Sequence, residues 1–435
     1  MKLLRLLLHG VIVFCSSSFP PNYADITLAG VLKAAQKKAK LQDFGITNEN
    51  DFKKHFDLIM SSKEYKQQKL TNLGFVFANL ELQMCFVRRL KFVDFLKQNP
   101  DVLKTKVVSP VFVMGLPRTG TTLMHRLLSL DPRVRSPYLW ELLNPVPIKN
   151  SSDEDEINKD RQKRAKHIQK LLESRKKLGD SSVDHIHEIG YDQPEECLVA
   201  MSDEMPLQMQ FLYPNYMNAD AFLSLPALPA YAWYRKILQL LSYQVTSERK
   251  NPRNWMLKCP MHLFYIKEIA KVFPDAKIIW THRHPVSAVP SMCSLIKAFH
   301  KFYYEPEGRN DSELGRKISN FTQKMLQKAP EDIKNAGLDS KHIIYNDLVN
   351  DPKAIVKDIY SAFNWPYTEE YDKLLDEYLQ KNEEERHMIK KKRNTQGGGT
   401  LHKYEPEEFG LTSDELSNGV FAEYCKKFNV PMSRN

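Results

Sequence analysis

The chain has 435 residues, of which 42% are hydrophobic and 27% are charged. This composition is typical of a folded globular protein with room for more than one domain. The net charge of +10 suits an anionic ligand, but no tract interleaves Lys and Arg with aromatic residues, so we expect no nucleic-acid partner. The six Cys are scattered without metal-ligand spacing, which argues against a cysteine-held metal and a disulfide scaffold.

Residues 1–24 are predicted to be a signal peptide or a short leader. Two basic residues precede an apolar stretch at 6–15, and three serines follow it. The stretch is shorter than the roughly 20 residues of a membrane span, so it predicts at most a loose membrane association. Three glycosylation sequons begin at Asn150, Asn310 and Asn320. Together these features predict a glycoprotein of the secretory pathway (ER or Golgi lumen, or secreted) if the leader is a signal, and a cytoplasmic protein otherwise.

Residues 25–104 are predicted to form a helical region that packs on the core. Apolar residues recur at helical spacing in 26–41 and again in 69–100, where the pattern ends at Pro100. Further along, residues 151–178 run from acidic to basic, which is typical of a solvated helix.

The stretch 110–128 reads PVFVMGLPRTGTTLMHRLL and predicts a strand, a glycine turn and a helix. Such a turn points successive N–H groups at one anion, and the helix adds its positive end. The predicted phosphate ligands are Arg118, Thr119, Gly120, Thr121 and Thr122. A nucleoside triphosphatase has Lys directly after the second glycine, where this chain has Thr121.

Strands are also predicted in 254–260, 276–283 and 342–347, with helices between them. This alternation predicts an α/β fold, a parallel sheet flanked by helices, whose ligands bind at the carboxyl ends of the strands. Lys258 and Arg283 stand at such ends, where a triphosphatase would place an acidic ligand for Mg²⁺. Ser291 follows on the second turn of the next predicted helix, and with Arg283 it makes a second phosphate clamp.

With these residues the chain resembles the sulfotransferases that use 3′-phosphoadenosine 5′-phosphosulfate (PAPS), in the branch common in bacteria and some eukaryotes. Residues 117–122 look like their 5′-phosphosulfate loop, Arg283 with Ser291 like their 3′-phosphate clamp, and Tyr345 like a Tyr beside the nucleotide. The resemblance covers roughly residues 27–425. It implies a P-loop-like sheet in a sulfotransferase domain at 105–430, with PAPS as co-substrate and no metal.

The resemblance also suggests catalytic residues. Sulfuryl transfer places negative charge on the oxygen that bridges sulfur and the 5′-phosphate, and Arg118, Thr121, Thr122 and Lys258 are the candidates to stabilise it. For the general base we consider His262, which follows Lys258 at a longer spacing than the family's common pattern, and Glu141 after the loop helix. His185 and His187 are further options. Arg393, near the glycines 397–399, matches the family's C-terminal phosphate contact loosely.

The predicted function is transfer of a sulfuryl group from PAPS to a hydroxyl of a small-molecule acceptor. Residues 197–245 are rich in Met, Leu, Tyr and Pro, so they either line an apolar pocket for a lipophilic alcohol or phenol, or form helical core. A carbohydrate or protein acceptor is an alternative. A non-catalytic nucleotide-binding protein and a metal-dependent kinase or triphosphatase are alternatives of other classes.

Overall fold

The computed structural model describes residues 26–46, 70–177, 190–204, 226–246, 248, 251, 253–306, 310–395 and 404–432. The predicted leader at 1–24, His185 and His187 lie outside these residues. The chain forms two compact units. The helical unit consists of Met1–Val107, Pro137–Pro252 and Cys293–Lys317, and the sheet unit of Val108–Ser136, Arg253–Met292 and Ile318–Asn435.

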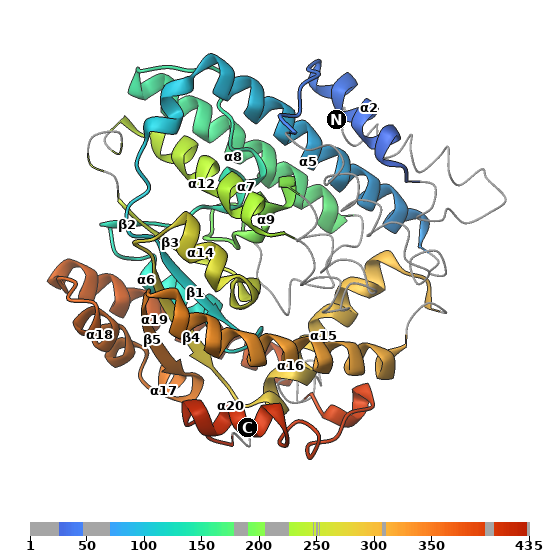
Figure 1. Ribbon diagram of the computed structural model, residues 1–435, viewed down its shortest axis with the longest axis vertical. Coiled ribbons are helices and arrows are strands. Elements are labelled where there is room, and N and C mark those ends of the chain that lie inside the picture. Colours follow the sequence, from blue (N-terminus) through green and yellow to red (C-terminus); the bar gives the residue numbers. More distant parts are fainter. Residues whose placement is uncertain are drawn as a thin grey trace. The chain divides into compact units, whose positions relative to one another are not determined.

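The sheet unit is built on five parallel strands in the order β2-β3-β1-β4-β5 (Figure 1). The strands are β1 (Val111–Gly115), β2 (Val134–Arg135), β3 (Asn254–Lys258), β4 (Lys277–His282) and β5 (Asp339–Ile344). The predicted α/β class with a parallel sheet is therefore confirmed. Because all strands are parallel, the segments after β1, β3, β4 and β5 begin at one edge of the sheet.

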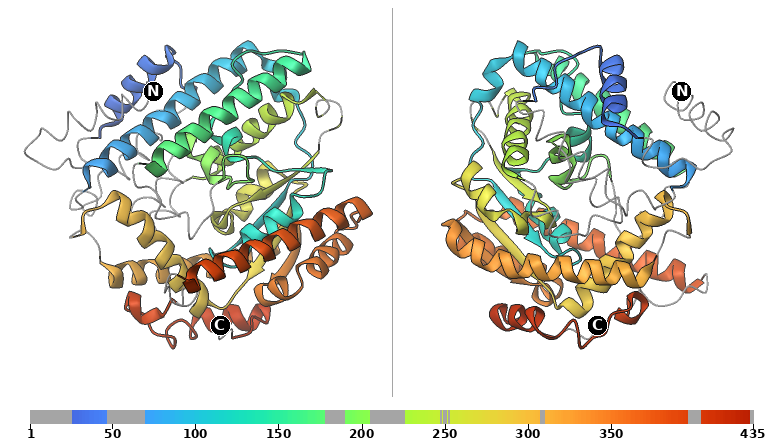
Figure 2. Two further views of the ribbon diagram at one scale, coloured as in Figure 1. Left: turned by 180° about the vertical axis from the view of Figure 1, so that it is seen from behind. Right: turned by 45° about the vertical axis from the view of Figure 1, so that its right-hand side comes forward.

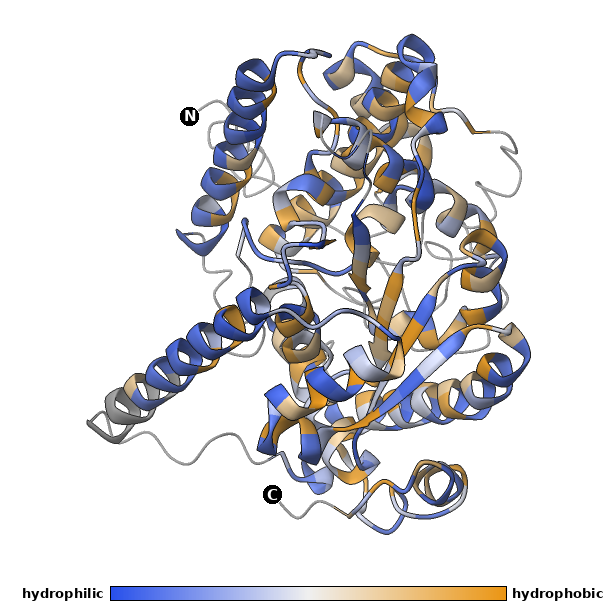
Figure 3. Cartoon of the chain, turned by 90° about the vertical axis from the view of Figure 1, so that its left-hand side faces the viewer, coloured by the Kyte–Doolittle hydropathy of each residue, from blue (hydrophilic) through white to orange (hydrophobic). Residues whose placement is uncertain are grey.

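The central strand β1 is buried along its whole length because helices cover both faces of the sheet. On one face Val111 and Val113 pack in a core with apolar residues of α6 (Thr121–Leu128) and α18 (Pro352–Ala362). On the other face Phe112 packs against Phe273. The hydrophobic strands stand out in Figure 3, and the edge strand β5 carries more polar residues, with only Ile343 fully buried.

The other helices of the sheet unit cover these two faces and the strand ends. They are η5 (Pro260–Phe264), α14 (Ile266–Val272), α17 (Tyr345–Asn350), α19 (Glu369–Thr395), η7 (Pro406–Phe409) and α20 (Val420–Phe428). Two long helices, α15 (Pro285–Tyr303) and α16 (Asp311–Ala336), run from one unit into the other.

The helical unit holds the predicted N-terminal helices, α2 (Leu28–Ala39) and α5 (Asn72–Gln98), which lie side by side in Figure 2 and share one apolar core. Its other elements are η2 (Pro100–Lys104), α7 (Leu139–Leu143), α8 (Glu154–Lys177), α9 (Leu198–Met201), η3 (Ser202–Glu204) and α12 (Leu228–Tyr243). The charged stretch predicted as a solvated helix is α8, which is mostly exposed.

A buried ion pair also stabilises the helical unit. Arg88 of α5 donates from Nε to both carboxylate oxygens of Asp203, at 2.8 and 3.1 Å, and both side chains are buried. The fork of hydrogen bonds compensates the cost of taking the two charges out of water. In the described part of the chain, no helix has the length and apolar character needed to cross a membrane.

Candidate anion-binding site

The segment after β1 turns sharply before α6 begins at Thr121. Arg118 has φ +70° and Gly120 has φ +86°, so two of the five turn residues are left-handed. No side chain caps the start of α6, because Gly120 stands at its N-cap position. Uncapped N–H groups and the positive helix end make this turn a ready site for an anion.

A pair of threonines fixes the shape of the turn. The Thr119 hydroxyl donates to the Leu116 carbonyl at 2.6 Å and lies 2.7 Å from the hydroxyl of Thr281 on β4. A Cβ on Gly115 would come within 2.4 Å of the Thr281 hydroxyl, so the glycine makes room for this contact. Thr119 is fully buried, and its hydroxyl serves the turn. Thr281 was not foreseen from the sequence, although it stands two residues before Arg283 on the same strand end.

Four residues named from the sequence meet beside this turn. Arg283, directly after β4, donates from Nη1 to the Arg118 carbonyl at 2.9 Å. Arg118 in turn donates from Nε to the hydroxyl of Ser291 at 3.1 Å. Ser291 lies on the second turn of α15, which begins at Pro285 as predicted. The guanidinium of Arg283 lies 4.2 Å from the ring centre of Tyr345, the first residue of α17.

The charge of this cluster is positive and partly desolvated. Burial lowers the pKa of Arg283, and the neighbouring charge of Arg118 lowers it further. The Nε of Arg283 is buried without a hydrogen-bond partner among the described residues. Two guanidinium groups of like charge held together favour a bound anion, which would satisfy both.

Lys258 and His262 lie near each other at the end of β3. Lys258 is the last residue of β3, pairs in register with Val113 of β1, and is buried. His262 in η5 is also buried, with its ring edge-on to Phe112 at 5.0 Å. Burial and the charge of Lys258 lower the pKa of His262 to about 3, so its imidazole is neutral at physiological pH.

Glu141 belongs to the helical unit, where it lies in the first turn of α7. One carboxylate oxygen accepts the backbone N–H of Tyr138 at 3.1 Å, and the other accepts from Arg161 at 3.1 Å. The side chain is buried, and its two partners fix the carboxylate in one orientation.

The remaining candidate, Arg393, lies in the last turns of α19, and its side chain is outside the described part of the structure. The glycines at 397–399 and His402 fall outside it as well. Within the described ranges, no group of three His, Cys, Asp or Glu is placed to hold a metal ion.

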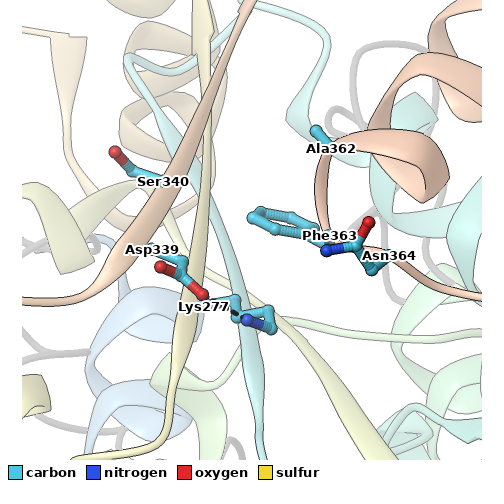
Figure 4. A pocket seen from close by; sticks show the side chains of 6 residues that line it. All are labelled: Lys277, Asp339, Ser340, Ala362, Phe363 and Asn364. Atoms are coloured by element: carbon cyan, nitrogen blue, oxygen red, sulfur yellow. Dashed lines mark hydrogen bonds and ion pairs between the residues drawn. The ribbon is translucent and has the colours of Figure 1, made fainter.

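A shallow cavity of about 330 Å³ lies elsewhere in the sheet unit (Figure 4). Lys277 and Asp339, the first residues of β4 and β5, form an ion pair in its wall, and Phe363 faces them. The cavity is thus at the amino ends of the strands, whereas the turn after β1 is at their carboxyl ends. Ligands of parallel sheets bind at the carboxyl ends, so we do not assign this cavity to the candidate site.

The fold and the turn together define an α/β protein whose parallel sheet has a P-loop-like turn at its carboxyl edge. A model of the sulfotransferase family matches residues 110–369, and the chain belongs to this family. The match begins just before β1 and extends to the start of α19, so it includes every strand of the sheet.

Relatives and solved structures agree with this assignment. The omega-hydroxy-beta-dihydromenaquinone-9 sulfotransferases Stf3 of Mycobacterium bovis and Mycobacterium tuberculosis are each 24% identical over 276 residues, 62% of this chain. The match spans 66% of the length of these relatives, slightly less than two thirds.

Among solved structures, sulfotransferase STF9 from Mycobacterium avium is similar with a TM-score of 0.76 and 25% identity, covering 95% of this chain and 99% of that one. Sulfotransferase STF1 from Mycobacterium tuberculosis has the same fold, with a TM-score of 0.73 and 23% identity over 92% of this chain and 99% of its own.

Proposed function

We propose that this protein transfers a sulfuryl group from PAPS to a hydroxyl group of a lipophilic acceptor. One observation carries the proposal: Arg118, Arg283, Ser291 and Tyr345, far apart in the sequence, converge beside an uncapped helix N-terminus. A donor with two separate phosphates, and no triphosphate, needs two adjoining anion sites of this kind.

The 5′-phosphosulfate binds at the turn after β1 in this proposal. The N–H groups at the start of α6 and the hydroxyls of Thr121 and Thr122 donate to it, and the Arg118 side chain adds a positive charge. Thr119 acts through the turn, because its hydroxyl is engaged with Leu116 and Thr281. The 3′-phosphate binds to Arg283 and Ser291, and the buried Arg283 Nε is a donor that this phosphate would satisfy.

The reaction is an in-line displacement at sulfur. The acceptor oxygen forms a bond to sulfur while the bond from sulfur to the bridging oxygen breaks, and 3′-phosphoadenosine 5′-phosphate leaves with the electron pair. Arg118, Thr121, Thr122 and Lys258 stabilise the growing negative charge, each by roughly 3–4 kcal/mol by analogy with oxyanion-hole donors. A base takes the proton of the acceptor hydroxyl.

Of the two candidate bases, His262 is the less suited to take a proton. A pKa of about 3 makes His262 a weak proton acceptor, and its ring is packed in the core against Phe112. Glu141 is a carboxylate that Arg161 and the Tyr138 N–H keep in one orientation. His262 is then a packing residue of the core beneath Lys258.

The acceptor is proposed to be a lipophilic alcohol or phenol. The curated relatives named above carry omega-hydroxy-beta-dihydromenaquinone-9 in their name, an acceptor with a terminal hydroxyl on a long isoprenoid chain. Around α12 the helical unit supplies buried apolar residues, which are compatible with such an acceptor but also serve as core.

The test is sulfuryl transfer from ³⁵S-labelled PAPS to a panel of acceptors: a hydroxylated isoprenoid quinone, a simple phenol, a long-chain alcohol and a sugar. Labelled isoprenoid, alcohol or phenol product, identified by mass spectrometry, would support the proposal. Labelled sugar alone would overturn the acceptor class. Mg²⁺-dependent transfer or hydrolysis of the ATP γ-phosphate, with no label transferred, would overturn the donor.

A further inference from the structure

A hydrogen-bonded chain of three side chains runs from the exposed His342 of β5 to Tyr424, through the residue directly before Arg283. His282, the last residue of β4, is fully buried between His342 of β5 and Tyr424 of α20. Its Nε2 lies 2.9 Å from Nδ1 of His342, and its Nδ1 lies 2.9 Å from the Tyr424 hydroxyl. Arg283 follows His282 directly, so Tyr424 holds the residue next to it.

Aromatic stacking holds this chain in place. Phe428, one turn after Tyr424 on α20, stacks on His282 at 4.4 Å and on His342 at 5.0 Å between ring centres. Trp280 packs beside both histidines from the same face of β4. The rings hold the imidazole of His282, which is fully buried, against the partners just named, whereas His342 is exposed on the edge strand.

The protons of the chain have one arrangement that satisfies every donor. Burial raises the pKa of Tyr424 well above its usual range, so the hydroxyl keeps its proton and donates it to Nδ1 of His282. His282 then carries its own proton on Nε2 and donates it to Nδ1 of His342. The reverse arrangement leaves the buried Tyr424 O–H without an acceptor among the described residues, which is costly.

This hydrogen-bonded chain includes His282, the residue directly before the arginine on which the proposed donor site depends. Tyr424 holds the ring of His282, the residue directly before Arg283, while the side chain of Arg283 reaches the Arg118 carbonyl and the ring of Tyr345. The point where the chain leaves β4 sets the direction of the guanidinium. We propose that Tyr424, held by His282 and His342, is a positioning residue that aims Arg283 at the 3′-phosphate of the donor.

This inference rests on the proposed donor site. If the hydrogen-bonded chain positions Arg283, the affinity for the donor should fall in acid. Desolvation lowers the pKa of His342, as does the charge of Lys427 on α20, so His342 gains a proton below its ordinary value near 6.5. Protonated His342 carries an N–H on Nδ1, which faces Nε2 of His282. His282 must then accept this hydrogen bond on Nε2 and carry its own proton on Nδ1. The chain of hydrogen bonds reverses, and Tyr424 loses its acceptor.

The first test is the affinity of Tyr424→Phe for 3′-phosphoadenosine 5′-phosphate, measured by calorimetry on the full chain. The ring stays, so stacking with Phe428 persists, and only the hydroxyl is lost. We expect binding to weaken about five- to tenfold, as for one lost hydrogen bond. Tyr371→Phe is the matched control, because Tyr371 is also buried and donates to a backbone carbonyl, of Leu127, in the same unit.

The second test is the pH dependence of the same affinity between pH 8 and pH 5. In His342→Asn, the amide oxygen replaces the Nδ1 acceptor but does not titrate, so we expect wild-type affinity at pH 8 and a weaker loss in acid. The ligand phosphates titrate in the same way with both proteins. The difference between the two pH profiles of the affinity therefore reports the titration of His342.

Equal affinity of Tyr424→Phe and Tyr371→Phe, together with parallel pH profiles, would overturn this inference and leave the donor site intact. A wild-type protein that does not bind the nucleotide would overturn the proposed function itself, and the positioning role with it.

Discussion

Arg118 and Arg283 meet at the turn after β1, where the side chain of Arg283 donates to the backbone carbonyl of Arg118. Burial partly desolvates the charge of Arg283, and the nearby charge of Arg118 lowers the pKa of Arg283 further. Like charges held this close raise the energy of the empty site, and a bound phosphate relieves it. In the proposed donor site, arginines that follow two strand ends take the place of the lysine that triphosphatases have after the second glycine.

Arg283→Ala is expected to weaken binding of 3′-phosphoadenosine 5′-phosphate by roughly 2–4 kcal/mol, about 30- to 700-fold, because a desolvated charge contact is lost. Calorimetry measures the loss. Arg283→Lys should recover part of it, since the charge remains but the fork does not. Arg133→Ala, which removes an ion pair with Asp131 in the same unit, should leave the affinity unchanged. Full affinity in Arg283→Ala would refute the clamp.

Glu141→Gln and His262→Phe separate the two candidate bases. Gln retains an acceptor for the Tyr138 N–H, and Phe retains the ring that packs on Phe112. If Glu141 is the base, kcat should fall about 10²- to 10⁴-fold in Glu141→Gln with nucleotide affinity nearly intact. His262→Phe should keep most of its activity. The opposite ranking of the two kcat values would reassign the base to His262.

At the scale of elements, β1 and α6 together fix the conformation of the turn between them. The strand is rigid because it is central and buried, and the helix begins at a glycine whose φ of +86° other residues adopt with strain. A Cβ on Gly120 would lie 2.9 Å from Leu348 and 3.1 Å from Tyr345, so the turn and α17 are closely packed.

Gly120→Ala is expected to cost roughly 1–3 kcal/mol of unfolding free energy and to weaken nucleotide binding, because the added methyl pushes against Tyr345. Denaturant unfolding and calorimetry give the two values. Gly337→Ala is a matched control, since Gly337 also has a positive φ of +66° but open space around its Cα. If both variants bind the nucleotide equally, the contact with Tyr345 does not shape the site.

For the whole molecule, buried neutral histidines link stability to pH. The pKa of His262 is lowered to about 3 by burial and by Lys258, and the pKa of His282 is also lowered, by burial and His342. The unfolded chain binds protons on these residues near pH 6.5, and the native chain does not. Between about pH 6.5 and pH 3 the unfolded state therefore holds more protons, so the free energy of unfolding falls as the pH falls.

His262→Phe is expected to lose stability less steeply with acid than the wild type, by up to about 1.4 kcal/mol per pH unit. Urea unfolding at intervals from pH 7 to pH 4 gives the slopes. His387→Gln, at an exposed position of α19, should follow the wild-type slope. Identical slopes for His262→Phe and the wild type would mean that His262 is not kept neutral by the fold.

The α/β class and four of the five strands were predicted from the sequence, which missed the short strand β2, and the residues of the candidate anion site stay a prediction. These follow from local patterns: apolar runs mark buried strands, glycines mark the turn, and in a parallel sheet residues such as Arg118 and Arg283 come out at one edge. The sequence pattern predicted a domain boundary at residue 105. The contacts in the structure instead group the chain into two units, each made of three separated stretches.

The environment of each side chain depends on the tertiary structure. Thr119 and Thr281, His262 and Phe112, and the chain from His342 to Tyr424 join residues up to 162 positions apart, so no spacing in the sequence announces them. Burial, and with it the pKa of His262, is a property of that packing and of no local pattern. The physical reason is that hydrogen bonding and desolvation depend on distances in space, which local periodicity does not encode.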